Sequence, residues 1–474
     1  MGLTYFYSVF GILSVICFFL ETTKTPEDKI STSSVFNSFK NNYIFVYCLM
    51  MAGDWLQGPY VYALYQYYNY DRGDIGRLFI AGFGSSMVFG TVVGSLADKH
   101  GRKAASITYC ITYILSCFTK HSSKYGWLLL GRVLGGISTS LLFSAFESWL
   151  VSEHIKRGFE PNWLSVSFSK AIFLGNGLVA IFSGLLANTL VVDAGLGPVA
   201  PFDAAVCVLA IGMTIIAFTW TENYGDPSEG KNLIRQFATA AKLIAADEKI
   251  ALLGAIQSLF ESSMYTFIFL WTPALGSETK FGLEIPHGFV FATFMLASMI
   301  GSSLASRLLA RPFLRVERYM QFVFLVASAS LLLPTYAGYF DEHSNNVAAE
   351  IAADGISPGG RIQMAGFLIF EVCVGIFWPS MMKMRSDYVP EESRSTIMNF
   401  FRIPLNMFVC IVLYNVSVFP ISSMFATCAA LLVAAALLTR RLLVLSTTDK
   451  ARSRIEQWRA EAKHQRVIAA ELAI

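Results

Sequence analysis

The chain has 474 residues, of which 54% are hydrophobic and only 15% are charged, and its formal net charge is +3. This composition excludes an ordinary soluble protein, because the few charges fall between long apolar blocks. The positive residues lie in separate loops rather than on one face, so we expect no binding to nucleic acid. The apolar blocks have the length of helices that cross a bilayer and are too widely spaced for barrel strands, which predicts an all-α membrane protein.

The first apolar block, residues 4–20, has no basic segment before it and is followed by charged residues rather than by a cleavage site. We therefore predict a retained transmembrane helix and not a signal peptide. Twelve further helices are expected, in two sets of six. The first set is predicted at 43–66, 75–97, 103–120, 126–150, 165–190 and 200–220, and the second at 247–272, 288–310, 316–337, 362–384, 394–415 and 421–445.

An internal repeat relates the two sets of helices. GSLADK at 94–99 matches SSLASR at 302–307, and Asp54 and Glu261 stand in nearly the same register within their halves. The predicted domains are an extra helix and linker at 1–42, an N-terminal six-helix bundle at 43–220, a polar cytoplasmic linker at 221–246, a C-terminal six-helix bundle at 247–445 and a basic tail at 446–474.

The distribution of lysine and arginine predicts the orientation in the membrane. One set of loops is rich in them, for example at Arg102 and Lys103, whereas the opposite loops carry few, among them Lys120 and Lys124. Because basic loops stay in the cytosol, we expect the 94–103 loop and the C-terminus to be cytoplasmic. The extra helix then places the N-terminus outside the cell.

The loop GSLADKHGRK at 94–103 resembles the cytoplasmic signature loop of the major facilitator superfamily. The resemblance implies the two six-helix bundles of that superfamily, to which the predicted first helix is added, and transport by alternating access. Asp98, at a helix end, can attract basic side chains and helix N-termini, so Asp98 and Arg102 are candidate gating residues. The alternative is a solvated turn that only fixes the topology. Ser306 replaces the acid in the second copy, so any latch is asymmetric.

Charged residues inside the predicted spans carry the functional prediction, because each is costly unless it faces a wet cavity or a partner. Helical spacing puts Asn399, Arg402 and Asn406 on one face, which predicts a polar cavity. The candidate substrate-binding residues are Arg402, Lys170, Arg132, Asn399 and Asn406, and the candidate coupling carboxylates are Asp54, Glu147, Glu261 and Glu371.

Lys170 and Arg402 stand at equivalent places in the two halves, so we expect them to flank a central site. Arginine offers a planar fork and lysine a point charge, a combination that suits a tetrahedral divalent oxyanion. The alternative is that the cations form buried pairs with Asp54 and Glu261. The carboxylates are candidates for carrying coupling protons, and no histidine lies deep in a span. The eight cysteines form no CxxC pair, so we expect no metal site and no cofactor.

Six further blocks resemble the molybdate-anion transporter family of eukaryotes. The resemblance implies a multi-pass cell-membrane protein that takes up molybdate, and it covers the segments that contain Asp54, Arg132, Glu147, Glu261 and Arg402. The blocks are GDWLQGPYVYALYQ at 53–66, GRVLGGISTSLLFSAFESW at 131–149, GLGPVAPF at 195–202, LFES at 259–262, FLWTP at 269–273 and NFFRIPLN at 399–406.

Three alternatives stay open at this point. A carrier of the same fold would transport sulfate or another small solute, because one fold serves many substrates. A non-transporting receptor would have lost the signature loop or gained a signalling domain, and the sequence shows neither. A membrane enzyme would need a nucleophile, a metal or an acid–base cluster near a membrane surface, and we find none, so enzyme activity is not expected.

Overall fold

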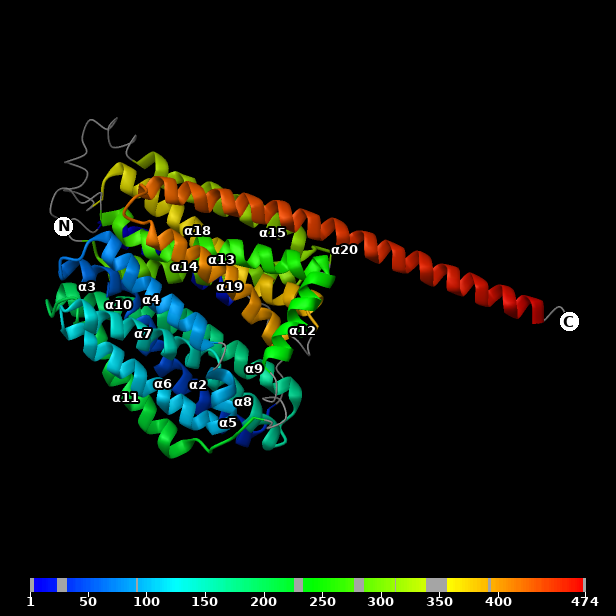
Figure 1. Cartoon of the computed structure of the whole chain (residues 1–474), viewed down its shortest axis with the longest axis horizontal. Helices are drawn as coiled ribbons and strands as arrows, with labels where there is room; N and C mark the ends of the chain where they lie inside the picture. Colours follow the sequence, from blue (N-terminus) through cyan, green and yellow to red (C-terminus); the bar gives the residue numbers. More distant parts are fainter. Residues whose placement is uncertain are drawn as a thin grey trace.

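A computed structural model describes residues 4–23, 32–90, 93–225, 233–276, 285–311, 313–337, 356–390 and 394–471. The regular elements of these ranges are all helical, which confirms the all-α fold class. Figure 1 shows the helices in two groups that follow the chain order, one coloured blue to green and the other green to red. We call them the N-terminal and C-terminal sets.

The N-terminal set begins at Ser34 and ends at Thr219. Its elements are α2 (Ser34–Trp55), η1 (Gly58–Tyr60), α3 (Val61–Tyr67), α4 (Arg72–Gly90), α5 (Val93–His100), α6 (Arg102–Phe118), η2 (Thr119–His121), α7 (Tyr125–Leu142), α8 (Ala145–Lys156), α9 (Pro161–Ala171), η3 (Ile172–Leu178), α10 (Val179–Asn188), η4 (Thr189–Asp193) and α11 (Ala200–Thr219).

The C-terminal set follows a helix, α12 (Leu233–Ala246), within the segment predicted as a polar linker. Its elements are α13 (Glu248–Gly276), α14 (His287–Leu309), α15 (Val316–Leu332), η6 (Leu333–Tyr336), α18 (Pro358–Tyr388), α19 (Arg394–Tyr414) and α20 (Ile421–Glu471). Most of the stretch between the helices predicted at 316–337 and 362–384 lies outside the described residues.

Two helices depart furthest from the ranges that the apolar pattern predicted. α2 begins nine residues earlier than expected, because Ser33 caps it by accepting a hydrogen bond from the Phe36 amide at 3.2 Å. The first turns of α2 contain polar residues, among them Lys40, so the hydropathy pattern did not predict this start. α20 continues past residue 445 as one helix to Glu471, into the segment predicted as a tail.

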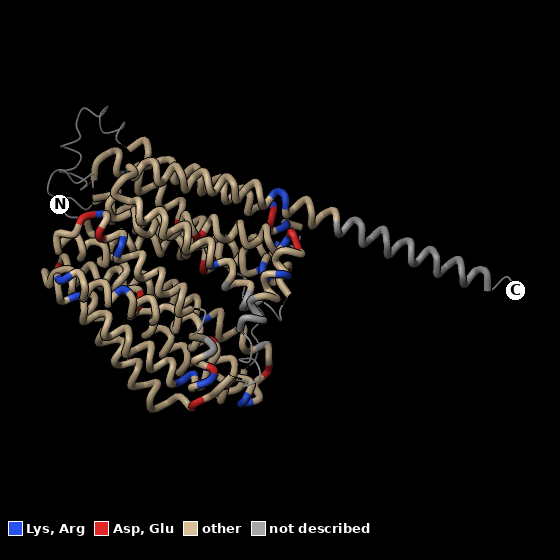
Figure 2. Tube along the Cα trace, viewed as in Figure 1, with Lys and Arg blue, Asp and Glu red and all other residues tan. Residues whose placement is uncertain are grey.

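Eight helical stretches of the described chain are long and apolar enough to cross a membrane. They begin at Thr4, Tyr125, Trp163, Ala200, His287, Val316, Pro358 and Ile421. α2, α4, α6, α13 and α19 are not among them. A helix with one polar face needs protein or water against that face within the bilayer, so these less apolar helices are the ones expected to surround a cavity. Figure 2 shows most charged residues at the ends of the helices.

The extra helix, α1 (Thr4–Thr22), packs along α14 of the C-terminal set. The Arg307 guanidinium donates to the carbonyl of Leu20 and to the hydroxyl of Thr23, each at 2.6 Å. A cation in this position also complements the negative end of the α1 dipole. At the other end, the Tyr5 hydroxyl donates to the carbonyl of Arg361 at 3.3 Å. α1 is therefore fastened at both ends to the C-terminal set.

The two sets meet where α4 packs on α19 and α10 packs on α14. A Cβ added at Gly76 would lie 2.6 Å from the carbonyl oxygen of Leu413, and one added at Gly288 would lie 2.5 Å from that of Gly184. Only glycine allows backbones to approach so closely. We call this contact, formed by Gly76, Leu413, Gly184 and Gly288, the distal seal. It lies toward the helix ends opposite the 94–103 turn.

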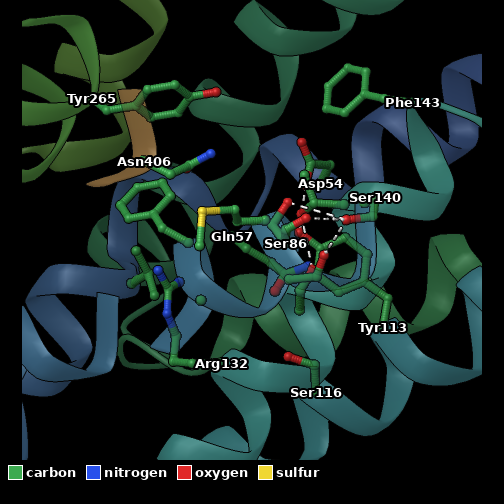
Figure 3. Close-up of a pocket in the computed structure, with 18 of the residues that line it drawn as sticks. Asp54, Gln57, Ser86, Tyr113, Ser116, Arg132, Ser140, Phe143, Tyr265 and Asn406 are labelled. Carbon is green, nitrogen blue, oxygen red and sulfur yellow. Dashed lines mark hydrogen bonds between the residues drawn. The ribbon is translucent and has the colours of Figure 1, made fainter. Parts of the chain in front are cut away.

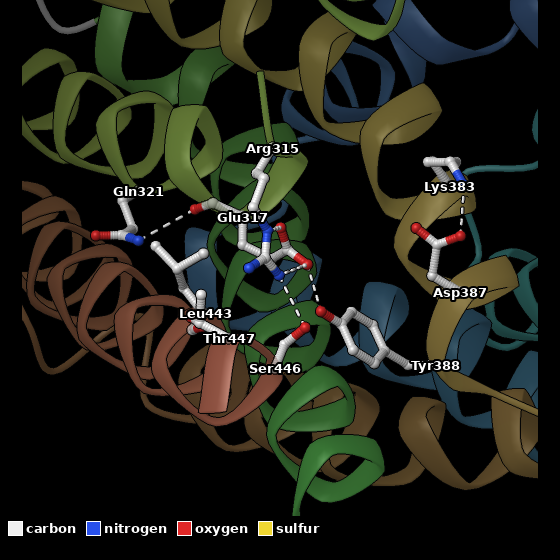
Figure 4. A network of polar contacts seen from close by, with 9 residues as sticks. All are labelled: Arg315, Glu317, Gln321, Lys383, Asp387, Tyr388, Leu443, Ser446 and Thr447. Carbon is white, nitrogen blue, oxygen red and sulfur yellow. Dashed lines mark hydrogen bonds and ion pairs between the residues drawn. The ribbon is translucent and has the colours of Figure 1, made fainter. Parts of the chain in front are cut away.

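A polar network ties α20 to the end of the C-terminal set that lies near α12 (Figure 4). Glu317 is buried and accepts hydrogen bonds from Arg315, at 3.2 and 3.3 Å, and from the Tyr388 hydroxyl. Arg315 also donates to the Ser446 hydroxyl at 2.8 Å. The network joins α15, α18 and α20 and satisfies a carboxylate that would otherwise be buried without a partner.

Candidate functional site

A cavity of about 270 Å³ lies between the two sets. Its lining residues come mainly from α2, α4, α6, α7, α13 and α19, which include all five of the less apolar helices. Three cations line the cavity, namely Lys120, Arg132 and Arg402, together with one carboxylate, Asp54. The formal charge of the lining is therefore +2.

Arg132 reaches the cavity from α7 (Figure 3). Its guanidinium lies 4.2 Å from the centre of the Phe79 ring and donates through Nε to the carbonyl of Leu78 at 3.3 Å. Gly82 provides the room, since a Cβ there would lie 3.0 Å from Nη2 of Arg132. Among the described residues, no carboxylate forms an ion pair with Arg132. Most of its donors remain free for a ligand.

Asp54 lies at the end of α2, where the Tyr113 hydroxyl donates to it at 2.5 Å. Neutral polar groups surround this pair, as Figure 3 shows. The hydroxyls of Ser86 and Ser140 are 3.2 Å apart, and the amide of Gln57 is turned toward the backbone of its own helix. Hydroxyls that can rotate offer donors to an anion without adding charge.

Arg402 and Asn406 line the cavity from α19. The Asn406 amide donates to the carbonyl of Arg402 at 2.8 Å. Arg402 forms no ion pair within the described part of the chain. Asn399 belongs to the same helix, but its side chain lies outside the described residues.

Glu261 is buried in α13, and its cationic partner is neither Lys170 nor Arg402. Arg385 lies 3.6 Å from its carboxylate and also donates to the Gln257 side chain at 3.0 Å, while Gln257 donates to Glu261 at 2.8 Å. Arg385 lies one residue past the helix predicted at 362–384 but within α18 as observed. Because Arg385 neutralises Glu261, Arg402 is left available to a ligand.

The structure does not bring Lys170 into this cavity. Lys170 is exposed on α9 and is not among the residues that line the cavity. The expectation that Lys170 and Arg402 flank one site is therefore corrected. The cations that share the cavity with Arg402 are Arg132 and Lys120.

The remaining predicted carboxylates lie in other places. Glu371 is buried within α18 and is not among the lining residues. Glu147, on α8, lines a second hollow together with Arg102 and Tyr224. Phe143 borders both hollows, so the second one continues from the cavity toward the 94–103 turn.

Aromatic rings close the cavity toward the distal seal. Phe269 of α13 meets Tyr62 with ring centres 5.2 Å apart and Phe79 with ring centres 5.1 Å apart. Tyr265 of α13 likewise contacts Phe83, with ring centres 5.2 Å apart. Each contact joins the C-terminal set to the N-terminal set, so the cavity is covered on this side by rings from both.

The 94–103 turn contains the expected acid–base contact. Arg102 donates to Asp98 at 2.7 Å and to the carbonyl of Ser148 at 3.1 Å. The N-terminus of α6 is capped by Glu222, which accepts from the amides of Lys103 and Ala104 at 2.8 and 3.1 Å. Sequence reasoning had not included Glu222, which joins the turn to the chain after α11.

Comparisons with known proteins agree with this architecture. The MFS_5 family model, described as sugar transporters with 12 transmembrane helices, matches residues 5–367. The molybdate-anion transporter of Xenopus laevis is 35% identical over 375 residues, 78% of each chain, and that of Takifugu rubripes is 32% identical over 437 residues, 87% of each chain.

Solved transporters share the fold at low sequence identity. A peptide transporter in complex with sulfate gives a TM-score of 0.65 at 13% identity and covers 91% of this chain and 98% of its own. A D-xylose–proton symporter gives a TM-score of 0.62 at 12% identity, and the match covers 86% of this chain and 97% of the symporter. These structures confirm the transporter fold.

Proposed function

Because the chain belongs to the molybdate-anion transporter family of the major facilitator superfamily, we propose that it carries molybdate across the cell membrane. The structural observation that supports this substrate is the net positive charge of the cavity lining. Its lining bears three cations and one carboxylate, and a divalent anion would neutralise the resulting charge of +2.

The chemistry of the lining supports a tetrahedral oxyanion. Two guanidinium groups, from Arg132 and Arg402, present planar forks to oxyanion oxygens from different sets. The hydroxyls of Ser86 and Ser140 can rotate to add neutral donors, whereas the Tyr113 hydroxyl already donates to Asp54. Sulfate has the same charge and shape and is the second candidate, so discrimination would depend on the size of the cavity.

We propose transport by alternating access, with the bundles at 43–220 and 247–445 rocking about the cavity. The closed distal seal, and the hollow that leads toward the 94–103 turn, support an inward-facing arrangement in which that turn is cytoplasmic and the N-terminus extracellular. Asp54 is the proposed proton carrier, because it is the predicted coupling carboxylate that lines the cavity. The protein would act as a carrier and not as an enzyme.

Uptake of labelled molybdate into metal-starved cells that express the protein tests this proposal. We expect saturable uptake that an excess of unlabelled molybdate abolishes and that sulfate inhibits less strongly. With proton coupling, uptake rises as the external pH is lowered. Uptake no greater than in cells without the protein would contradict the proposal, and stronger inhibition by sulfate would favour sulfate as the substrate.

Replacing Asp98 with asparagine is expected to slow the transport cycle more than it weakens binding. The change keeps the shape of the side chain but removes the charge that holds Arg102. Because the pair is partly exposed, the loss in stability should be small, about 1 kcal/mol or less. We expect a lower maximal uptake rate with a nearly unchanged half-saturating concentration. A change in the half-saturating concentration alone would place Asp98 outside the gate.

A further inference from the structure

We propose that Lys120 is a third anion-binding residue of the cavity and favours dianions over monoanions. This inference rests on the proposed function and extends it to the basis of charge selectivity. Lys120 follows α6 in the short helix η2, in a segment that sequence reasoning assigned to an outer loop. In the structure its side chain is 2% exposed and lines the cavity.

Two tyrosines hold Lys120 in place. Its Nζ donates to the Tyr65 hydroxyl at 2.9 Å and lies 5.3 Å from the centre of the same ring. The Tyr68 hydroxyl donates to the backbone carbonyl of Lys120 at 2.6 Å. Both tyrosines belong to the segment of α3 and the turn after it. The ammonium group is thus fixed in position, and two of its three N–H donors remain beyond the bond to Tyr65.

The charge of Lys120 is not neutralised by any carboxylate in the described part of the chain. Asp203, the acid that contacts the residue after Lys120, already has a partner, because it pairs with His121 at 2.8 Å. A buried ammonium with only a neutral hydroxyl as acceptor is unfavourable unless an anion binds beside it.

Lys120 and Arg132 lie on the same wall of the cavity. A Cβ added at Gly131, the residue before Arg132, would lie 3.2 Å from the Nζ of Lys120. The N-terminal set therefore presents two cations, while Arg402 of the C-terminal set presents one. Attraction to such a group grows with the charge of the ligand, so a doubly charged oxyanion gains more from Lys120 than a singly charged one of similar size.

The test measures binding of molybdate and of perrhenate, a tetrahedral oxyanion with a single charge, to the purified full-length protein by calorimetry. The main variant is Lys120→Gln, whose amide can still donate to Tyr65 but carries no charge. We expect it to lose about tenfold or more in affinity for molybdate, the equivalent of one charge-assisted hydrogen bond. The loss for perrhenate should be smaller.

Three further variants complete the test. Lys120→Arg keeps the charge and should retain most of the affinity, and Lys120→Met removes both the charge and the hydrogen bond and should lose as much as Lys120→Gln. Lys124→Met, at an exposed lysine four residues away, is the matched control and should bind as the unchanged protein does.

Two results would overturn the inference. One is an unchanged molybdate affinity in Lys120→Gln or Lys120→Met. The other is an equal loss for both oxyanions, which would indicate a structural role for Lys120. If Arg402→Ala no longer binds molybdate while the Lys120 variants bind it with unchanged affinity, the proposed function stands and this inference fails. If the unchanged protein binds neither oxyanion, both fail.

Discussion

Replacing Arg402 with alanine should abolish molybdate uptake while leaving the protein folded. Arg402 is exposed on the cavity side of α19 and forms no ion pair within the described residues, so its removal costs the fold little. The loss of a guanidinium that binds an oxyanion costs about 3 kcal/mol, which is more than a hundredfold in affinity. The measurement is uptake of labelled molybdate together with the amount of protein at the cell surface.

Two companion variants define the role of Arg402. Arg402→Lys keeps the charge but not the planar fork, and it should retain part of the uptake. Met407→Ala changes an exposed residue of the same helix that does not line the cavity, and it should transport normally. Normal uptake by Arg402→Ala would remove this residue from the site.

Replacing Gly76 with valine should abolish uptake by keeping the distal seal open. An added Cβ at this position would lie 2.6 Å from a carbonyl oxygen of α19 and 2.9 Å from the Val416 side chain. Such overpacking costs about 1 to 3 kcal/mol, and the cost falls only on the conformation in which the two sets touch here. At 3 kcal/mol the population of that conformation falls more than a hundredfold, so the carrier cannot complete its cycle.

The matched control for this variant lies on the same helix. A Cβ added at Gly84 meets nothing within 4 Å, so Gly84→Val should transport normally. Gly76→Val should still bind molybdate after purification, because Gly76 does not line the cavity. Uptake equal to that of Gly84→Val would show that closure at this point is not required.

The fold and the family could be predicted from local sequence because their signals are local. The turn at 94–103 and the spacing of apolar blocks do not depend on how the two halves meet. Asp54, Arg132 and Arg402 could be found in the same way, because a charge within an apolar span is conspicuous. Their assembly around one cavity is visible in the structure, and their roles in transport remain proposals.

Lys120 and Arg385 could not be found by the same reasoning. Both lie near helix ends, where lysine and arginine are ordinarily loop residues that fix the topology. Their burial depends on contacts with Tyr65 and Glu261, which are distant in sequence. One local signal for Lys120 was present, since Tyr113, Ser116 and Lys120 follow helical spacing and all three line the cavity.

The expectation for Lys170 failed because it assumed that the two halves repeat each other in detail. The helix that carries Lys170 passes into a π-helical segment, Ile172–Leu178, directly after it. A π turn holds more residues than an α turn, so it rotates the faces on either side of it relative to each other. The corresponding region of α19 is α-helical, with Pro404 inside it and no π segment. Sequence position alone therefore did not predict a common orientation.

In the proposed alternating-access cycle, the contacts of Arg307 with α1 would limit how far the carrier opens toward the cytosol. Although α1 is the first helix of the chain, it packs on the C-terminal set, whereas α2 belongs to the N-terminal set. The connection from Thr23 to Thr32 can reach at most about 30 Å when fully extended. If the two sets rock as proposed, this connection would limit their separation on the side that we propose to be cytoplasmic, in addition to the linker between the halves.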